Sequence, residues 1–200
     1  SGGKLMEDQH TTKQELRQQI ISVLENLSKT ERDKRTQAIE ARLFEFANFL
    51  EARIVMMYMP GPGEVDTRAM IQRALQYNKI VVLPSFSPDS KNVGLYKVDS
   101  LDSQLVEGPG GISQPDPKRC KQVPLDVVDI AILPAIGLDE KGGRLGSGLE
   151  LYDLLMPRLA PTTRKVALGF EEQLVPQIHM DSQDRFVDII ITNQRTIYKI

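Results

Sequence analysis

Continuous apolar segments alternate with amphipathic segments along most of the chain, and this order restricts the fold more than any other feature. The apolar segments show no inside–outside alternation, which is typical of strands buried on both faces of a sheet. Strands that alternate with helices predict an α/β fold of three layers, α/β/α, with a mainly parallel sheet. The predicted strands are 52–59, 79–86, 127–136, 164–170 and 187–193, with another nearer a sheet edge at 93–98.

The segments between these strands have either helical periodicity or the composition of a loop. Apolar residues at helical spacing predict a helix at 13–27. Ser28 followed by Glu31 is a capping-box pattern, which predicts a second helix from 28 to 50. The remaining predictions are helices at 66–78 and 148–159 and a long loop, rich in Gly, Pro and Asp, at 102–124.

The bulk composition is that of one globular domain. Residues 1–12 have the character of a disordered lead, so we assign a single domain to 13–200. A net charge of -2 argues against nucleic-acid binding, which requires a basic surface. No apolar run approaches the ~20 residues of a membrane span. Cys120 is the one cysteine, so no internal disulfide can form, and we expect a cytoplasmic location.

Three unusual loops follow predicted strands, at 60–67, 134–148 and 170–186. Ligands of parallel α/β sheets bind at the carboxyl ends of the strands, where such loops meet. The second loop continues into "LDEKGGRLGSGLELYD" (138–153), whose glycine N–H groups and Arg144 suit an anion. Because its spacing matches neither the P-loop nor the dinucleotide fingerprint, a phosphate site and a plain turn both stay open.

Other charged residues have a functional and a plain interpretation. Lys13 and Arg17 lie four apart on one helix face, where they would hold an anion or simply face solvent. Glu64 follows "PGPG" in a rigid loop, where it would pair with a polar ligand or belong to a surface turn. Carboxylates near a phosphate site would suit Mg²⁺. The candidates are Asp139, Asp153, Asp181, Asp184 and Asp188.

The order of several short motifs resembles one known family. Residues 131–155, "AILPAIGLDEKGGRLGSGLELYDLL", are similar to the signature of 5-formyltetrahydrofolate cyclo-ligase, also called methenyltetrahydrofolate synthetase. The resemblance covers nearly the whole chain. The other matching motifs are "KQELR", "YMPGPGEVDT", "GGISQP" with Gln114 in place of an acid, "GFEEQLV" and "DRFVDIIIT".

The resemblance implies a NagB/RpiA-like fold and a specific reaction. The family converts 5-formyltetrahydrofolate to 5,10-methenyltetrahydrofolate with ATP as co-substrate and Mg²⁺, releasing ADP and phosphate. The formyl oxygen is a poor leaving group, and phosphoryl transfer to it would make it a good one. Catalysis of this transfer is mostly positioning and charge stabilisation. The expected partners are a reduced folate and ATP, and we expect a monomer.

The resemblance also assigns residues to roles by matching motif positions. Arg144 and Tyr152 are the expected catalytic residues. Met59 and Glu64 are expected to bind the folate, and Asp153 and Asp184 the metal. The residues expected to bind ATP are Lys13, Arg17, Arg144, Gly146, Ser147, Gly148 and Tyr152.

The glycine loop departs from the family pattern at Leu149, Glu150 and Leu151. Glu150 replaces a glycine and Leu151 the first tyrosine, while Ser147 stands where the family usually has a basic residue. Glu150 adds negative charge near the expected triphosphate and loses the conformational freedom of glycine. Two alternatives therefore remain: a diverged member that binds folate or nucleotide without turnover, and an interaction module that binds neither.

Overall fold

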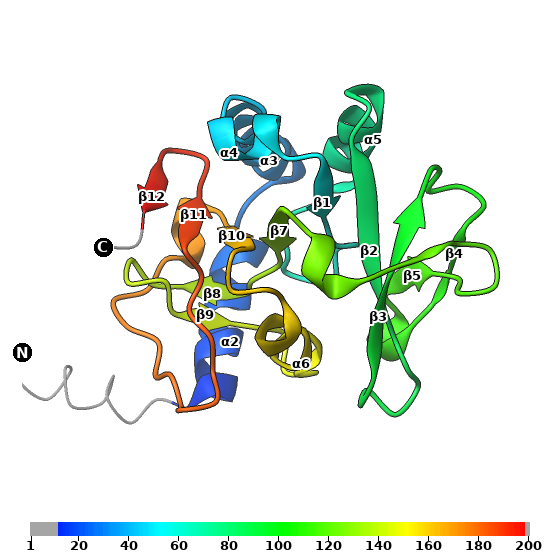
Figure 1. Cartoon of the computed structure of the whole chain (residues 1–200). Coiled ribbons are helices and arrows are strands. Elements are labelled where there is room, and N and C mark those ends of the chain that lie inside the picture. Colours follow the sequence, from blue (N-terminus) through cyan, green and yellow to red (C-terminus); the bar gives the residue numbers. More distant parts are fainter. Residues whose placement is uncertain (1–11, 199–200) are drawn as a thin grey trace, which may run out of the picture.

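A computed structural model describes residues 12–198 of the chain (Figure 1). Apart from Thr12, the expected lead lies outside the described residues. The Thr12 side chain accepts a hydrogen bond from the N–H of Glu15 at 3.1 Å and caps the first described helix. The predicted α/β class with a mainly parallel sheet is confirmed.

The central sheet has eight strands in the order β12-β11-β10-β7-β1-β2-β3-β6. β1 pairs in parallel with β2 and β7, and β10 with β7 and β11. β3 and β12 pair antiparallel with their neighbours, and β6 pairs antiparallel with β3. The strands are β1 (Ile54–Met56), β2 (Ile80–Phe86), β3 (Val93–Val98), β6 (Gln122–Val123), β7 (Ile130–Leu133), β10 (Arg164–Leu168), β11 (Ile189–Ile191) and β12 (Thr196–Tyr198).

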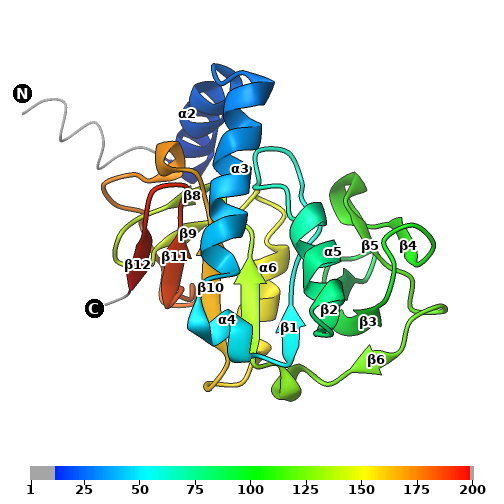
Figure 2. The same ribbon diagram turned by 90° about the horizontal axis from the view of Figure 1, so that it is seen from above.

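Helices cover both faces of the sheet. The described helices are α2 (Lys13–Glu25), α3 (Lys29–Leu43), α4 (Ala47–Glu51), α5 (Arg68–Gln76) and α6 (Leu151–Leu155). Val81 and Ile130 belong to an apolar cluster that includes buried residues of α2, α3, α4 and α5. Their chain neighbours Val82 and Ala131 belong to a second cluster that includes α6. Figures 1 and 2 show α3 and α5 on the side of the sheet opposite α6.

The predicted single helix at 28–50 is wrong, because the chain breaks between α3 and α4. The break lets both Phe44 and Phe49 reach the core, with ring centroids 5.1 Å apart. The Arg73 guanidinium lies 4.3 Å from the Phe44 ring centroid and covers its outer side. A continuous helix would separate these two rings along its axis, so aromatic burial overrides local helix propensity here.

The range 102–124 is not a plain loop. It contains β4 (Leu105–Glu107) and β5 (Ser113–Pro115), which form an antiparallel hairpin, followed by β6. Gly110 and Gly111 have φ values of 69° and 75° and form the hairpin connection. The prediction missed these strands because they are short and their Gly- and Pro-rich surroundings carry no alternating pattern.

Three more short elements differ from the prediction. β8 (Gly137–Leu138) and β9 (Arg144–Leu145) form a hairpin within the loop predicted at 134–148. The following helix, α6, begins at Leu151, later than predicted, because Gly148 and Glu150 have φ values of 98° and 59°. β12 was not predicted at all. Within the described part of the chain, no helix is both long and apolar enough to cross a membrane.

Candidate active site

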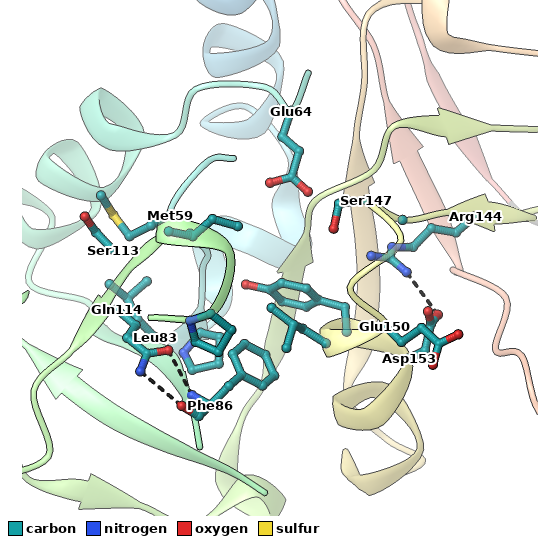
Figure 3. A pocket seen from close by; sticks show the side chains of 16 residues that line it. Met59, Glu64, Leu83, Phe86, Ser113, Gln114, Arg144, Ser147, Glu150 and Asp153 are labelled. Atoms are coloured by element: carbon teal, nitrogen blue, oxygen red, sulfur yellow. Dashed lines mark hydrogen bonds and ion pairs between the residues drawn. The ribbon is translucent and has the colours of Figure 1, made fainter. Parts of the chain in front are cut away.

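One pocket lies at the carboxyl ends of the central strands, and most of the predicted site residues line it (Figure 3). The loop after β1, the end of β2, the β4–β5 hairpin and the glycine loop before α6 all contribute. Its lining residues are Met59, Glu64, Leu83, Pro84, Phe86, Pro109, Ile112, Ser113, Gln114, Arg144, Gly146, Ser147, Glu150, Leu151, Tyr152 and Asp153. The loops at 60–67 and 134–148, which follow parallel strands, therefore meet at this pocket as predicted.

Arg144 provides a buried positive charge at the pocket wall. Its side chain is 3% exposed, and its Nε donates to the carbonyl oxygen of Pro134 at 2.7 Å. Nη1 lies 3.4 Å from Oδ1 of Asp153. Burial lowers the pKa of the guanidinium, while the carboxylates of Asp153 and Glu64 oppose that shift. A fixed, poorly solvated cation of this kind is suited to stabilise a negatively charged group in the pocket.

Tyr152 lies between Arg144 and the apolar side of the pocket. The Arg144 guanidinium carbon is 5.7 Å from the Tyr152 ring centroid, and the Phe86 ring meets the same ring edge-on at 5.6 Å. Burial, together with the nearby Glu64 carboxylate, raises the pKa of Tyr152 well above its ordinary value. The hydroxyl therefore stays protonated at neutral pH and can donate a hydrogen bond to a ligand.

Glu64 points its carboxylate into the pocket (Figure 3). Its Oε1 accepts a hydrogen bond from the N–H of Gly61 at 2.7 Å, which holds the carboxylate in place. Burial raises the pKa of Glu64, although the Gly61 N–H and the charge of Arg144 act in the opposite direction. Met59 lines the pocket from the same loop. A partly buried acid beside an apolar side chain suits a flat heterocycle with polar edges.

The structure brings Arg17 to the glycine loop. Its Nε donates to the carbonyl oxygen of Gly146 at 2.7 Å. A Cβ atom added at Gly148 would lie 3.5 Å from the Arg17 guanidinium, and the φ of Gly148, 98°, favours glycine. The Ser147 hydroxyl lies 3.5 Å from the N–H of Leu149. The predicted ATP-binding glycines and Arg17 therefore form one surface.

Lys13, on the same helix, contacts a different loop. Its Nζ lies 3.2 Å from Oδ2 of Asp184 and 3.7 Å from Asp181. Asp184 also accepts from the N–H of Asp181 at 2.7 Å. Burial alone would raise the pKa of Asp184, but this N–H and the Lys13 ammonium lower it. α2 thus connects the glycine loop to the loop at 170–186.

The two predicted metal ligands are paired with separate cations, Asp153 with Arg144 and Asp184 with Lys13. Among residues 12–198, no group of three or more His, Cys, Asp or Glu side chains could hold a metal ion. Two other candidate carboxylates have structural partners. Asp139 is 2% exposed and accepts from three backbone N–H groups, and Asp188 accepts from the N–H of Lys165 at 2.9 Å.

Glu150 occupies the position where the family pattern has glycine, and it adopts a left-handed backbone conformation (φ 59°, ψ 16°). It is the residue before α6, yet its side chain makes no capping hydrogen bond to the helix. The backbone thus has the shape that glycine favours, while the side chain adds a carboxylate to the pocket lining. Leu151 is 6% exposed and packs with the α6 side of the core.

Gln173 organises the site, and sequence reasoning did not single it out. It is 1% exposed, and its Oε1 accepts from the N–H of Phe170 at 2.7 Å. Its Nε2 lies 3.0–3.1 Å from the carbonyl oxygens of Gly63, Ala135 and Ile136. One amide therefore joins all three loops at the carboxyl end of the sheet. The available signal was the motif "GFEEQLV", which matches the family but in which no role was assigned to Gln173.

Comparison with known proteins matches the sequence to one family. The model of the 5-formyltetrahydrofolate cyclo-ligase family matches residues 9–193. A Caenorhabditis elegans protein named "Probable 5-formyltetrahydrofolate cyclo-ligase" is 30% identical, over 92% of this chain and 94% of its own length. The "5-formyltetrahydrofolate cyclo-ligase" of Mus musculus is 26% identical, over 91% of this chain and 94% of its own.

The fold matches a solved structure of similar description. The Aquifex aeolicus 5,10-methenyltetrahydrofolate synthetase superposes with a TM-score of 0.81 at 28% identity, covering 94% of this chain and 93% of that one. The family resemblance seen in the motifs is therefore confirmed over almost the whole described chain. This protein belongs to the 5-formyltetrahydrofolate cyclo-ligase family.

Proposed function

We propose that the protein catalyses the reaction of its family, the ATP-dependent cyclisation of 5-formyltetrahydrofolate to 5,10-methenyltetrahydrofolate. The observation that carries this proposal is the convergence of Glu64, Arg144 and Tyr152, which come from separate motifs, on one pocket. A folate and a triphosphate must meet for this reaction, and the pocket joins an apolar, acid-lined side to a glycine loop with two cations.

The chemistry has two steps. The formyl oxygen attacks the γ-phosphorus of ATP, the bond from that phosphorus to the β–γ bridging oxygen breaks, and ADP leaves. N10 of the folate then attacks the activated formyl carbon, N10 loses its proton to solvent, the carbon–oxygen bond breaks and inorganic phosphate leaves. The protein mainly has to align the reacting atoms and stabilise charge on the transferred group.

The pocket suggests which residues perform these tasks. Arg144 is the buried cation for the phosphoryl group, and Tyr152, as a neutral hydroxyl, donates a hydrogen bond beside it. Glu64 accepts hydrogen bonds from the polar edge of the folate while Met59 packs on its ring. Lys13 and Arg17, with Gly146, Ser147 and Gly148, hold the rest of the triphosphate.

Mg²⁺ is part of the proposal as a companion of ATP. The carboxylates of Asp153 and Asp184 have the oxygen donors that Mg²⁺ prefers, and Mg²⁺ commonly takes one or two carboxylates plus phosphate oxygens. Because each carboxylate already faces a cation, the protein would supply few of the ligands and the phosphates the others. When bound, the ion would neutralise charge that develops on the phosphoryl oxygens.

The decisive experiment follows the absorbance of methenyltetrahydrofolate with and without ATP. We expect ATP-dependent product from the wild-type chain and a loss of at least about 100-fold in kcat/KM for Arg144→Ala, because a buried transition-state cation is removed. Arg158→Ala, at a solvent-facing arginine just after α6, is the matched control and should leave turnover unchanged. Absence of product at high enzyme concentration would exclude the proposal.

A second candidate is a protein that binds the folate without turnover, and Glu150 is the observation that favours it. A carboxylate in the glycine loop opposes a triphosphate. Calorimetry separates the two candidates, since folate binding without ATP binding would support the second. Failure of either ligand to raise the melting temperature would instead support an interaction module, because a ligand of the native state must stabilise it.

A further inference from the structure

The side-chain amide of Gln114 makes two hydrogen bonds to the backbone of a single residue, Phe86. The N–H of Phe86 donates to Gln114 Oε1 at 3.0 Å, and Gln114 Nε2 donates to the carbonyl oxygen of Phe86 at 3.1 Å (Figure 3). Gln114 lies on β5 of the hairpin, and Phe86 is the last residue of β2. The amide thus acts as a substitute for a neighbouring strand.

Phe86 requires such a partner because β1 is shorter than β2. β1 ends at Met56, which is opposite Val82, so the last residues of β2 extend beyond it. The N–H of Ser87 bonds to Asn92 on the β3 side, and peptide groups alternate in direction along a strand. The N–H and carbonyl of Phe86 therefore face the side where β1 has ended, and Gln114 satisfies both.

The same contact reaches the catalytic side of the pocket through aromatic packing. The Phe86 ring is 6% exposed and meets the Tyr152 ring edge-on at 5.6 Å. Tyr152 in turn lies against the guanidinium of Arg144. Holding the backbone of Phe86 therefore fixes the apolar surface against which Tyr152 is oriented.

We infer that Gln114 is a positioning residue for the reaction: its two hydrogen bonds to Phe86 set the place of the Tyr152 ring and seat the β4–β5 hairpin against the folate side of the pocket. The inference rests on the proposed function for its activity readout. Loss of these bonds should reduce kcat/KM for the folate about 3- to 10-fold, which corresponds to losing about one net hydrogen bond.

Gly108 shows that the hairpin is shaped around this amide. A Cβ atom added at Gly108 would lie 2.4 Å from Cδ of Gln114, too close to coexist with it. The backbone at Gly108 is extended, with φ -109° and ψ -168°, so alanine is compatible with it. Gly108→Ala is therefore a second way to displace the amide without changing Gln114 itself.

Gln114→Glu tests the inference through its pH dependence. The ionised carboxylate still accepts from the Phe86 N–H but faces the Phe86 carbonyl without a proton to donate. The protonated acid restores both bonds. We expect the variant-to-wild-type ratio of kcat/KM to be low at pH 8, where the carboxyl is ionised, and to rise towards one as the pH falls through the pKa of the new carboxyl, with enzyme-free blanks subtracted.

The variant-to-wild-type ratio separates the effect of titrating the new carboxyl from the effect of the groups already present. Glu64, Arg144, Glu150, Tyr152 and Asp153 face the same pocket in both proteins, so their titration is common to numerator and denominator. The matched control is a glutamine on the same segment of chain.

Gln104→Glu is that control. Its Oε1 accepts from the N–H groups of Asp99 and Ser100, so a carboxylate retains both bonds. The control should be active with a flat ratio. Gly108→Ala should reduce kcat/KM like Gln114→Ala, and combining the two should add little, because both remove the same contact.

The outcomes distinguish the inference from the proposed function. A flat ratio for Gln114→Glu in an active wild-type background, or the same pH trend in Gln104→Glu, would overturn the inference alone. If the wild type binds 5-formyltetrahydrofolate without turnover, calorimetry replaces the kinetic assay. The variant-to-wild-type ratio of folate affinities should then show the same pH dependence, and a flat ratio would overturn the inference. A wild type that neither binds nor converts this folate would contradict both the inference and the proposed function.

Discussion

Arg17 of the first described helix donates a hydrogen bond from Nε to the carbonyl oxygen of Gly146 at 2.7 Å, across 129 positions of sequence. Four positions earlier on the same helix, Lys13 pairs with Asp184 in the last loop of the site. One helix therefore presents two cations to loops that follow different strands of the sheet. The four-residue spacing puts both side chains on one helix face, and this face connects the two sides of the proposed ATP site.

Arg17→Ala should weaken ATP binding more than it weakens the fold. We expect KM for ATP to rise about tenfold, because a charge-assisted contact next to the phosphates is worth about 1.5 kcal/mol or more. Arg42→Ala is the matched control, since Arg42 also donates from a helix to a distant carbonyl, that of Gln194, at 2.5 Å. An equal rise in KM for both variants would contradict a role for Arg17 in the site.

Glu150→Gly should relieve backbone strain and raise ATP affinity. A left-handed residue other than glycine costs about 1–2 kcal/mol, and the flexibility of glycine offsets about 0.5–1 kcal/mol of this. We therefore expect a gain of up to about 1.5 kcal/mol in unfolding free energy, measured by denaturant titration. Removing the carboxylate should tighten ATP about fivefold, measured by calorimetry.

Two variants separate the strain at Glu150 from its charge. Glu150→Gln keeps the strained backbone and should raise only the ATP affinity. Ser90→Gly relieves the same φ of 59° in a turn away from the pocket and should raise only the stability. Adding Leu151→Tyr to Glu150→Gly restores the family residues at these two positions. Unchanged ATP affinity in all three Glu150 variants would show that this residue does not limit nucleotide binding.

Glu64→Gln should change the pH dependence of stability in a defined direction. Burial raises the pKa of Glu64 from its ordinary value of 4.5, so the folded state binds more protons than the unfolded state just above that value. The stability contributed by this carboxyl is therefore present below the ordinary pKa and is lost as the pH rises through the raised one. The free energy of unfolding of Glu64→Gln should therefore rise relative to that of the wild type as the pH increases from 4.5 through the raised pKa.

The same variant should bind the folate at least about tenfold more weakly, because the glutamine amide replaces a charged acceptor. Glu107→Gln, at an exposed carboxylate on β4 of the neighbouring hairpin, is the control and should match the wild type in both measurements. A free energy of unfolding of Glu64→Gln that falls relative to that of the wild type as the pH rises would contradict the buried-acid description of Glu64.

Gln173→Glu should destabilise the fold as a whole. It places an oxygen where the amide nitrogen now donates to the carbonyls of Gly63, Ala135 and Ile136. Unpaired buried acceptors and an added charge should cost about 3 kcal/mol or more in unfolding free energy. Gln72→Glu, on the exposed face of α5, is the control. Equal denaturation midpoints for the two variants would show that Gln173 does not hold the loops together.

Local patterns in the sequence identified six of the eight strands of the central sheet, all except β6 and β12, and several residues of the site. Apolar runs such as 79–86 and 164–170 identify strands buried on both faces, because a parallel sheet covered by helices leaves no polar side. The positions where these runs end predict where loops gather. Family motifs then assign roles to Glu64, Arg144 and Tyr152, and the structure brings the three residues together in one pocket.

Other features depend on contacts between residues far apart in the chain. Gln173 finds its acceptors 37, 38 and 110 positions away, and no local pattern encodes such partners. The bonds of Gln114 to Phe86 exist only because β1 ends before β2 does. Phe44 breaks a predicted helix because its ring packs against Phe49 in the core.

At Glu150 the sequence motif and the tertiary structure each contribute different information. The motif identifies it as a departure from glycine and predicts an unfavourable charge near the phosphates. The structure adds that the backbone there is left-handed, with a φ of 59°. Sequence periodicity reports which residues are buried, whereas backbone shape and polar pairing at the ends of strands are decided by how distant segments pack together.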